Sequence, residues 1–147
     1  MYKRILACLD GSRHGLHAAG AAIELAKLCG AQLCFLTVTR PYRVSPELRR
    51  FLQAENLLGE PKYVMDEMTQ GIVDEARGLA EHAGLKDFTT KVREGKPARA
   101  IVDYANSQDT DLIVVGSRGV GEVEAALLGS VSQKVSMLAE CSVIIVR

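Results

Sequence analysis

The 147-residue sequence has no excess of either charge, because eighteen Lys and Arg residues balance eighteen Asp and Glu residues. A chain without net charge has no overall field that would gather nucleic acid or an anionic membrane. No stretch approaches the length of a membrane span, and the apolar run Ile5–Leu9 is too short for a signal-peptide core. We therefore expect a cytoplasmic protein with neither nucleic acid nor a membrane as its partner.

The four cysteines include no C-x-x-C pair, so the usual spacing of a zinc or redox site is missing. Each of them lies inside an apolar segment of the sequence. In a reducing compartment, free cysteine behaves as a small buried hydrophobic residue. We therefore expect reduced core thiols at Cys8, Cys29, Cys34 and Cys141.

The overall composition is that of one globular domain. Hydrophobic residues make up 48% of the chain and charged residues 24%, a balance typical of a protein with a substantial core. The length is also that of a single domain. We therefore treat residues 1–147 as one domain, and we expect any partner to be recognised locally.

Five short apolar runs predict β-strands. The first, RILACL, is almost continuously apolar and closes with Asp-Gly-Ser, which is typical of a strand buried on both faces. The third, FTTKVRE, alternates instead, which favours a place nearer an edge of the sheet. The predicted strands are residues 4–9, 31–39, 88–94, 111–116 and 142–147.

Helical periodicity separates these strands. Apolar residues recur at helical spacing from Ser12, a candidate N-cap, to Gly30, where glycine is a natural stop. A later apolar stripe that includes Met68 and Leu79 predicts a long amphipathic helix. Pro97 suits a first helical turn, where its missing N–H costs nothing. The predicted helices lie between Ser12 and Gly30 and at residues 62–83, 97–108 and 130–138, and residues 40–61 show only a weak helical tendency.

Strands that alternate with helices imply parallel pairing through right-handed crossovers, because a parallel connection needs a long return path that a helix fills. We therefore predict an α/β fold: a three-layer sandwich with a five-stranded parallel sheet, helices on both faces and a Rossmann-like architecture. In such sheets the ligand crevice lies beyond the carboxyl ends of the strands, where the order of connections reverses. Asp10 and Gly116 both follow strands at that edge.

The loop after the fourth strand has the spacing Gly116-x2-Gly119-x9-Gly129-Ser130. Gly116 leaves the strand, and Gly119 permits a positive φ or a close approach of the backbone, so that consecutive N–H groups can point at one anion. A helix begins at Gly129-Ser130, and its first free N–H groups carry a partial positive charge. Those N–H groups belong to Val131, Ser132 and Gln133.

This chemistry suits a phosphate group, although a second interpretation stays open. Ser130 adds a hydroxyl donor, and Arg118 adds a full charge at the tip of the loop. However, Ser130 and Gln133 also have the spacing of a capping box, which needs no ligand. Glu122 and Glu124 lie inside the loop and would weaken an anion site if their side chains turned inward.

The combination of these elements resembles the universal stress protein family. The glycine-serine spacing agrees with that family's nucleotide-binding signature at every defined position. LDGS after the first strand, VREGKPARAIVDYA before the fourth, and GSVSQKV leading to a terminal VIIVR match as well, so the resemblance covers essentially the whole chain. It implies a five-stranded parallel α/β fold of the adenine nucleotide alpha hydrolase-like type, usually homodimeric. The chain resembles the members that keep the signature and bind ATP.

The resemblance also implies roles for individual residues. Asp10 would contact the ribose, and Val38 would offer backbone groups to adenine, with Cys8 and Val115 near the nucleoside. An Asp-Gly-Ser sequence after a strand is also an ordinary turn and helix cap, so Asp10 keeps a second interpretation. The implied ligand is ATP, with or without Mg²⁺ or Mn²⁺. The residues implied around the phosphates are Gly116, Arg118, Gly119, Gly129, Ser130, Val131 and Ser132.

The sequence contains no evident catalyst. No Lys follows the glycine loop as in a Walker motif, and no Ser/His/Asp set has an ordered context. His14 and His17, three positions apart, could share a metal, but no third ligand is evident. Asp10 is the one inward candidate for a base. We therefore expect at most slow ATP hydrolysis.

More than one function stays open at this stage. The first is an ATP-binding regulatory protein of the stress response, whose ATP-bound form differs from the free form in surface or assembly. The second is a nucleotide-free structural or interaction module in which backbone geometry alone keeps the loop, and a very slow ATPase is the third. The chain departs from its relatives at Glu122 and Glu124, where basic residues are frequent, and at AECSV, where Ala-Pro-Cys-Pro-Val is typical.

The last apolar run, Ser142–Arg147, predicts an assembly surface. If this strand lies at the edge of the sheet, its unpaired backbone groups invite pairing with another chain. Antiparallel pairing with its own copy would cover both edges at once and give a symmetric homodimer, which the resemblance also implies. Shielding of the strand by a neighbouring helix or loop would instead leave a monomer.

Overall fold

The computed structural model describes residues 1–41, 45–54, 61–121 and 127–147, in which strands and helices follow the predicted order. The strands are β1 (Arg4–Leu9), β2 (Gln32–Thr39), β3 (Phe88–Glu94), β4 (Leu112–Gly116) and β5 (Ser142–Val146). The helices are α1 (Arg13–Cys29), α2 (Pro46–Ala54), α3 (Pro61–His82), α4 (Pro97–Ser107) and α5 (Ser130–Leu138). The weak helical tendency of residues 40–61 thus becomes one short helix, α2.

The five strands form one parallel sheet in the order β3-β2-β1-β4-β5. The predicted five-stranded parallel sheet is therefore confirmed. The chain builds outward from β1 to β3 and then continues on the other side of β1 with β4 and β5. The connections therefore reverse direction between the neighbouring strands β1 and β4, and ligand crevices form at the carboxyl ends of such a strand pair.

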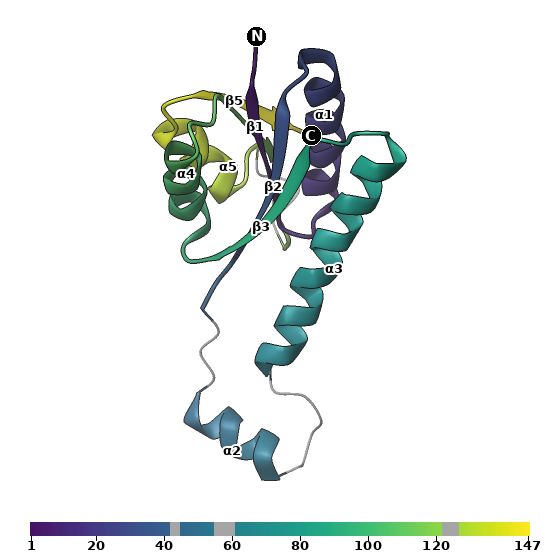
Figure 1. Cartoon of the computed structure of the whole chain (residues 1–147). Helices are drawn as coiled ribbons and strands as arrows, with labels where there is room; N and C mark the ends of the chain where they lie inside the picture. Colours follow the sequence, from purple (N-terminus) through teal and green to yellow (C-terminus); the bar gives the residue numbers. More distant parts are fainter. Residues whose placement is uncertain (42–44, 55–60, 122–126) are drawn as a thin grey trace.

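Helices cover both faces of the sheet, which gives the three layers visible in Figure 1. On one face, α1 and α3 pack around a core that includes Ile5 and Phe35. On the other face, α4 and α5 pack around a core that includes Leu6 and Ile113. Because successive residues of a strand point to opposite faces, β1 buries side chains in both cores. This explains why its sequence is almost continuously apolar.

Local signals set the ends of α1 and α4 as predicted. Ser12 is the N-cap of α1, and its Oγ accepts a hydrogen bond of 3.0 Å from the N–H of Gly15. Gly30 ends α1 with a φ of 64°, in the left-handed region that favours glycine. Pro97 is the first residue of α4. A side-chain cap contributes about 1 kcal/mol to stability, so single residues fix these boundaries.

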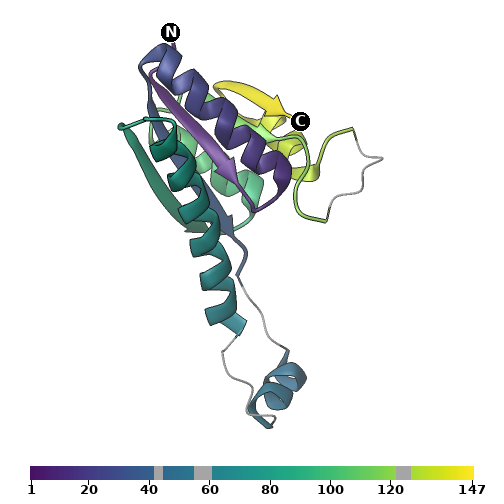
Figure 2. The ribbon, with the colours of Figure 1, turned by 90° about the vertical axis from the view of Figure 1, so that its right-hand side faces the viewer.

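The segment between β2 and β3 extends beyond the sandwich. Figure 2 shows α2 away from the sheet, at the end of an excursion that leaves the body after β2 and returns along α3. The predicted apolar stripe of α3 is only partly buried, because Ala76 is buried while Met68 and Leu79 are 59% and 37% exposed. Val73 and Ala80, which the predicted stripe did not include, are buried instead. Only the part of α3 that faces the sheet therefore contributes to the core.

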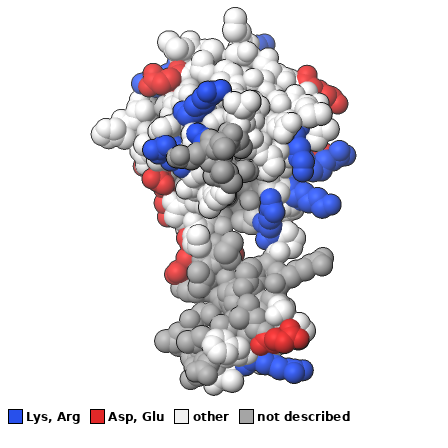
Figure 3. Space-filling view, turned by 180° about the vertical axis from the view of Figure 1, so that it is seen from behind, with Lys and Arg blue, Asp and Glu red and all other residues white. Residues whose placement is uncertain are grey.

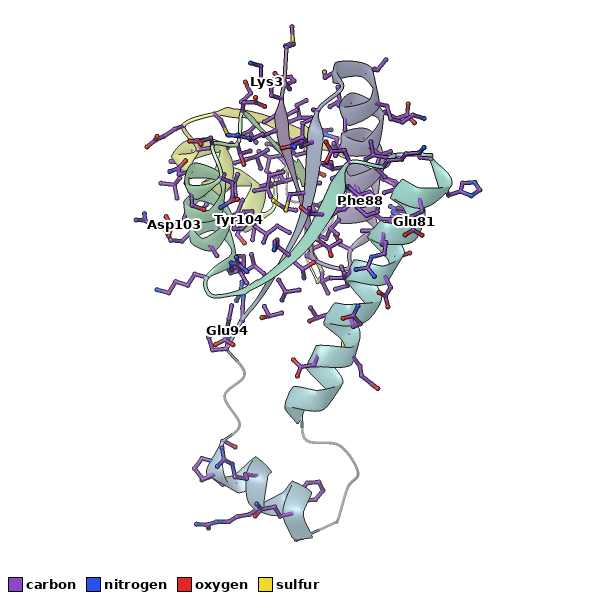
Figure 4. The ribbon with its side chains drawn as sticks, viewed as in Figure 1. Lys3, Glu81, Phe88, Glu94, Asp103 and Tyr104 are labelled. Carbon is purple, nitrogen blue, oxygen red and sulfur yellow. The ribbon has the colours of Figure 1, made fainter. Side chains whose placement is uncertain are left out.

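Two aromatic residues, labelled in Figure 4, pack near the β3 side of the sheet. Phe88 on β3 meets Phe35 on β2 edge to face, with ring centroids 6.0 Å apart. Tyr104 on α4 lies under the Arg93 guanidinium, 5.2 Å from ring centroid to Cζ. The Tyr104 hydroxyl is 3.6 Å from Cys34 Sγ. These contacts attach the outermost strand to its neighbour β2 and to α4.

The two edge strands differ in chemistry. β3 exposes Lys91, Arg93 and Glu94, charges that discourage pairing with a further strand. Its predicted place near an edge is confirmed by the strand order. β5 instead has apolar residues at 143–146, all half-buried. One edge of the sheet is therefore protected by charge, and the other is apolar.

The surface mixes charges of both signs. Figure 3 shows Lys and Arg side chains gathered on the right-hand side of the face seen from behind, with Asp and Glu side chains spread around the same face. This distribution agrees with the balance of charges in the sequence. In the described part of the chain, no helix has the length and apolar character needed to span a membrane.

Candidate functional site

A cavity of about 380 Å³ lies at the carboxyl ends of β1, β2 and β4, beside the N-terminus of α5. Its size falls within the range of small-molecule sites. Gln133, whose N–H was also predicted to face an anion, does not line the cavity. The structure brings the other eleven predicted residues to it. These residues are Cys8, Asp10, Val38, Val115, Gly116, Arg118, Gly119, Gly129, Ser130, Val131 and Ser132.

Further residues line the cavity that sequence reasoning did not nominate. Leu36, Pro97 and Ile101 add apolar surface near Val38, and Arg40 adds a charged side chain. Leu36 could have been found, because it lies two positions before Val38 on the same face of β2. Pro97 and Ile101 belong to α4, and only the packing of that helix across the sheet brings them to the site. One end of the cavity is therefore mainly apolar.

Asp10 sits directly after β1 at the mouth of the cavity, where its side chain is exposed. Its Oδ1 accepts hydrogen bonds from the N–H of Ser12, at 2.9 Å, and from the Ser12 hydroxyl. The turn-and-cap interpretation of Asp10 is therefore realised. Both of these hydrogen bonds use Oδ1, so Oδ2 can still accept a hydrogen bond from a ligand. Contact of Asp10 with a ribose stays a prediction.

Gly116 is required by packing between β4 and α1. A Cβ added at this position would lie 2.6 Å from the carbonyl carbon of His14 and 2.8 Å from the backbone nitrogen of Gly15. Real Cβ atoms do not approach backbone so closely, and backbone cannot move aside as a flexible side chain can. Gly116 thus lets the start of α1 pack directly on the end of β4, next to the cavity.

The backbone of the glycine loop decides between the two roles predicted for Gly119, a positive φ or a close approach of the backbone. In the described part of this loop the positive φ belongs to Gly121, at 74°. Gly129 has an extended conformation with φ −70° and ψ 161°, which other residues adopt as well. The reason for glycine at 119 and 129 is therefore not conformational. Close approach of a ligand stays the predicted reason.

The N-terminus of α5 also corrects the predicted cap. Gly129 is the N-cap, without a side-chain cap bond, and Ser130 is the first helical residue, so the capping box of Ser130 and Gln133 does not form. The N–H of Gln133 donates to the carbonyl of Gly129 at 3.0 Å. The N–H groups of Val131 and Ser132 precede that of Gln133, so neither of them has an acceptor within the helix. Their two N–H groups are what α5 offers to an anion.

Ser117 lies at the base of the loop and was not singled out from the sequence. It is 1% exposed, and its carbonyl accepts hydrogen bonds from the N–H of Gly129 and from Ser132 Oγ. Its Oγ is 3.3 Å from His14 Nδ1. A polar residue directly after a buried strand was the available signal, but only the folded contacts identify its partners.

His14 and Arg118 lie beside the loop, and the charge of Arg118 affects the protonation of His14. Partial burial and the nearby Arg118 guanidinium lower the pKa of His14 below its ordinary 6.5, with smaller contributions from Arg13 and His17, while Asp10 opposes them. His14 is therefore neutral at physiological pH. The permanent cation at this end of the cavity is Arg118.

We expect His14 to make stability depend on pH. Because folding lowers its pKa, the unfolded chain binds more protons than the folded protein between the folded value and 6.5. This contribution to stability is complete above pH 6.5 and is lost as the pH falls through the folded pKa. As the pH falls from 6.5 to the folded pKa of His14, the melting temperature of the wild type should therefore drop more steeply than that of His14→Gln. Parallel curves for the two proteins would contradict this assignment.

The cysteines are free thiols, all four half-buried rather than fully buried. Burial raises the pKa of the Cys8 thiol, and Cys34 and Asp10 raise it further. Cys8 thus stays protonated at neutral pH and lines the cavity as a thiol, although a nucleophile would need the thiolate form. Its contribution to the site is therefore apolar surface.

Two further expectations concern metals and acidic residues. Within residues 1–41, 45–54, 61–121 and 127–147, no group of three His, Cys, Asp or Glu side chains lies close enough to hold a metal ion. His17 instead places Nδ1 3.2 Å from the carbonyl oxygen of Arg147. Glu122 and Glu124 lie outside the described residues, so their predicted effect on an anion stays a prediction.

Comparisons with known proteins agree with this architecture. The model of a family described as the universal stress protein family matches residues 1–147. Universal stress protein YxiE of Bacillus subtilis (strain 168) is 34% identical over 153 residues, which cover 100% of both chains.

Two solved structures are similar over nearly their full length. One is a universal stress protein in complex with cAMP, with a TM-score of 0.74 and 27% identity over 99% of this chain and 97% of that chain. The other is the universal stress protein UspA from Lactobacillus plantarum, with a TM-score of 0.73 and 28% identity over 99% of this chain and 98% of that chain.

Proposed function

The chain belongs to the universal stress protein family, and from this premise we propose that it is a cytoplasmic, ATP-binding regulatory protein of the stress response. One observation carries the proposal. The sequence and the family resemblance predict eleven residues for a nucleotide site, and all eleven line a single cavity. Residues nominated by a chance resemblance would scatter over the surface.

The apolar end of the cavity suits a nucleoside. Val38 lies near the carboxyl end of β2. Its backbone N–H and C=O groups can pair there with the edge of an adenine ring. Cys8, Val115 and Ile101 add apolar walls for the flat faces of the base, and burial of such faces is favourable. Asp10 lies at the mouth, where a carboxylate can accept the hydroxyl groups of a ribose.

The opposite end suits phosphates. The N–H groups of Val131 and Ser132 lie in the first turn of α5. Backbone donors at a helix N-terminus favour an anion. Arg118 supplies a full charge beside them, and Ser130 supplies a hydroxyl group. Hydrogen bonds to charged oxygens are stronger than those between neutral groups. The direction from nucleoside to phosphate therefore runs from β2 toward α5.

The relative that was solved with cAMP supports an adenine nucleotide as the class of ligand. Adenine, ribose and phosphate are common to cAMP and ATP, so the same nucleoside contacts would serve both. We propose ATP in particular because the glycine-serine spacing from Gly116 to Ser130 resembles the signature of the family members that bind ATP. A Mg²⁺ or Mn²⁺ ion would arrive with the phosphates, since the described residues provide no ready-made metal cluster.

We also propose that the protein is a homodimer through Ser142–Arg147. β5 is an edge strand with apolar residues, whereas the opposite edge is charged. Met137 and Leu138, at the end of the helix that leads into β5, are 76% and 47% exposed. Pairing of β5 with its copy would satisfy both backbone edges and cover this apolar surface.

Titration calorimetry with ATP, GTP and adenosine tests the proposed ligand. We expect ATP to bind at least about tenfold more tightly than GTP, because Val38 presents a backbone pattern suited to adenine. ATP should also bind more tightly than adenosine, because only ATP reaches the N–H groups of α5. Equal affinity for ATP and GTP would contradict the assignment of the base site, and absence of ATP binding would contradict the function.

A further inference from the structure

Hydrogen bonds at one buried atom hold the two ends of the glycine loop together. The carbonyl oxygen of Ser117, directly after β4, accepts from the N–H of Gly129 and from Ser132 Oγ, the latter at 3.0 Å. Ser117 is 1% exposed and Ser132 is 2% exposed. We refer to Ser117, Gly129 and Ser132 as the loop clasp. The clasp fixes where the chain re-enters α5 relative to where it leaves β4.

The clasp is itself anchored to the rest of the fold. The N–H of Ser117 donates to the carbonyl of Val146 at 2.6 Å, and Ser117 Oγ is 3.3 Å from His14 Nδ1. His17, one helical turn after His14, lies 3.2 Å from the carbonyl oxygen of Arg147. Ser117 is therefore held from β5 and from α1, and its carbonyl is a fixed reference point for the start of α5.

The Ser132 hydroxyl is committed to this clasp. Its single hydrogen is shared between the carbonyl oxygens of Ser117 and Gly129, each 3.0 Å away. A hydroxyl has one hydrogen to donate, so it is not free to donate to a phosphate. Ser132 lines the cavity, and what it can give to a ligand is its backbone N–H.

We propose that Ser132 is a positioning residue, whose hydroxyl aims the N–H groups of α5 at the phosphates through the carbonyl of Ser117. This inference rests on the proposed nucleotide function, and it gives the Ser132 side chain a supporting role beside the predicted phosphate contact of its backbone N–H. Gly129 and Ser132 of the clasp line the cavity next to Val131, at the proposed phosphate end, whereas Val38 and Ile101 line the proposed nucleoside end. It therefore affects phosphate recognition without touching the nucleoside.

The test compares affinities for ATP and adenosine in Ser132→Ala. This variant removes the hydroxyl and keeps the backbone N–H. We expect ATP affinity to fall about tenfold, as for loss of a buried hydrogen bond, while adenosine affinity stays within about twofold. Ser136→Ala is the matched control, because Ser136 Oγ makes the same kind of bond one turn later, 2.7 Å to the carbonyl of Gln133 on the exposed surface. It should leave both affinities unchanged.

Equal losses of ATP and adenosine affinity would overturn the proposal, because they would indicate a general loss of structure. An unchanged ATP affinity would overturn it as well. Amide hydrogen exchange of Gly129 gives a readout without any nucleotide: Ser132→Ala should speed exchange at this amide, and Ser136→Ala should not. If the wild type binds neither ATP nor adenosine, the proposed function fails, and the exchange rate of Gly129 alone decides whether the clasp exists.

Discussion

Replacement of Gly129 by valine is expected to abolish ATP binding, with a loss of at least about a hundredfold in affinity. Gly129 lines the cavity and directly precedes the N–H groups at the start of α5. A branched side chain there would keep phosphates away from those donors. Each hydrogen bond to a charged group contributes about 1.5–3 kcal/mol, and loss of about 2.7 kcal/mol corresponds to a hundredfold change. Titration calorimetry measures the effect.

The same variant should remain folded. Gly129 has φ −70° and ψ 161°, which valine adopts without strain. Gly78→Val is the matched control, because a Cβ at Gly78 on α3 meets nothing within 4 Å and this helix does not line the cavity. Its melting temperature reports the cost of valine in a helix, and its ATP affinity should equal that of the wild type. A folded Gly129→Val protein with unchanged ATP affinity would show that the loop does not hold the phosphates.

Ile145→Lys is expected to halve the mass measured by light scattering, from two chains to one chain of 15.9 kDa. Ile145 is a half-buried residue of the edge strand β5. In a symmetric β5–β5 pair, the Ile145 side chain of each subunit would be covered by the partner strand. A lysine charge is costly to bury without a partner, and two such charges would also face each other across the symmetry axis.

The control for this variant is Leu28→Lys near the end of α1, where Leu28 is 82% exposed and is not part of the β5 edge. It makes a similar exchange of an apolar side chain for lysine and should leave the mass unchanged. Because Ile145 also packs against the core beneath α4 and α5, thermal melting should accompany the measurement. A wild type that already runs as a monomer at tens of micromolar would rule out the homodimer.

The parts of the fold that the sequence predicts well depend on short-range chemistry. The apolar run at 4–9 predicts a strand buried on both faces, and β1 is one. Ser12 caps the N-terminus of α1 with its side chain, and Gly30 ends the same helix in a left-handed backbone conformation. The alternation of strands and helices restricts the topology further, because parallel strands need crossovers. The strand order then follows with few alternatives.

Other features depend on contacts between distant segments, which local patterns do not encode. Glycine at 116 is explained by His14, far away in the sequence, because α1 packs on the end of β4. The left-handed glycine of the loop is Gly121 rather than Gly119, and a spacing pattern alone does not distinguish the two. Ser117 gains its partners only when β5 and α5 are in place.

The same difference between local patterns and contacts of distant segments applies to the candidate site. The residues predicted to bind a nucleotide follow from the glycine spacing and from the family resemblance, whereas Pro97 and Ile101 reach the cavity only because α4 packs across the sheet. Ser132 was nominated as a phosphate contact, and the structure commits its hydroxyl to the carbonyls of Ser117 and Gly129. Motifs therefore located the cavity, and the hydrogen bonds within it distinguish residues that would touch a ligand from those that support them.

Native mass spectrometry of the protein purified without added ligand tests the central claim most directly, namely that the cavity holds an adenine nucleotide. We expect wild-type protein to carry an added mass equal to an adenine nucleotide, which is released on denaturation and identified as ATP or one of its products. Gly129→Val protein prepared in the same way should carry none. Wild-type protein that is free of nucleotide, and that stays so after incubation with millimolar ATP, AMP and cAMP, would contradict the account.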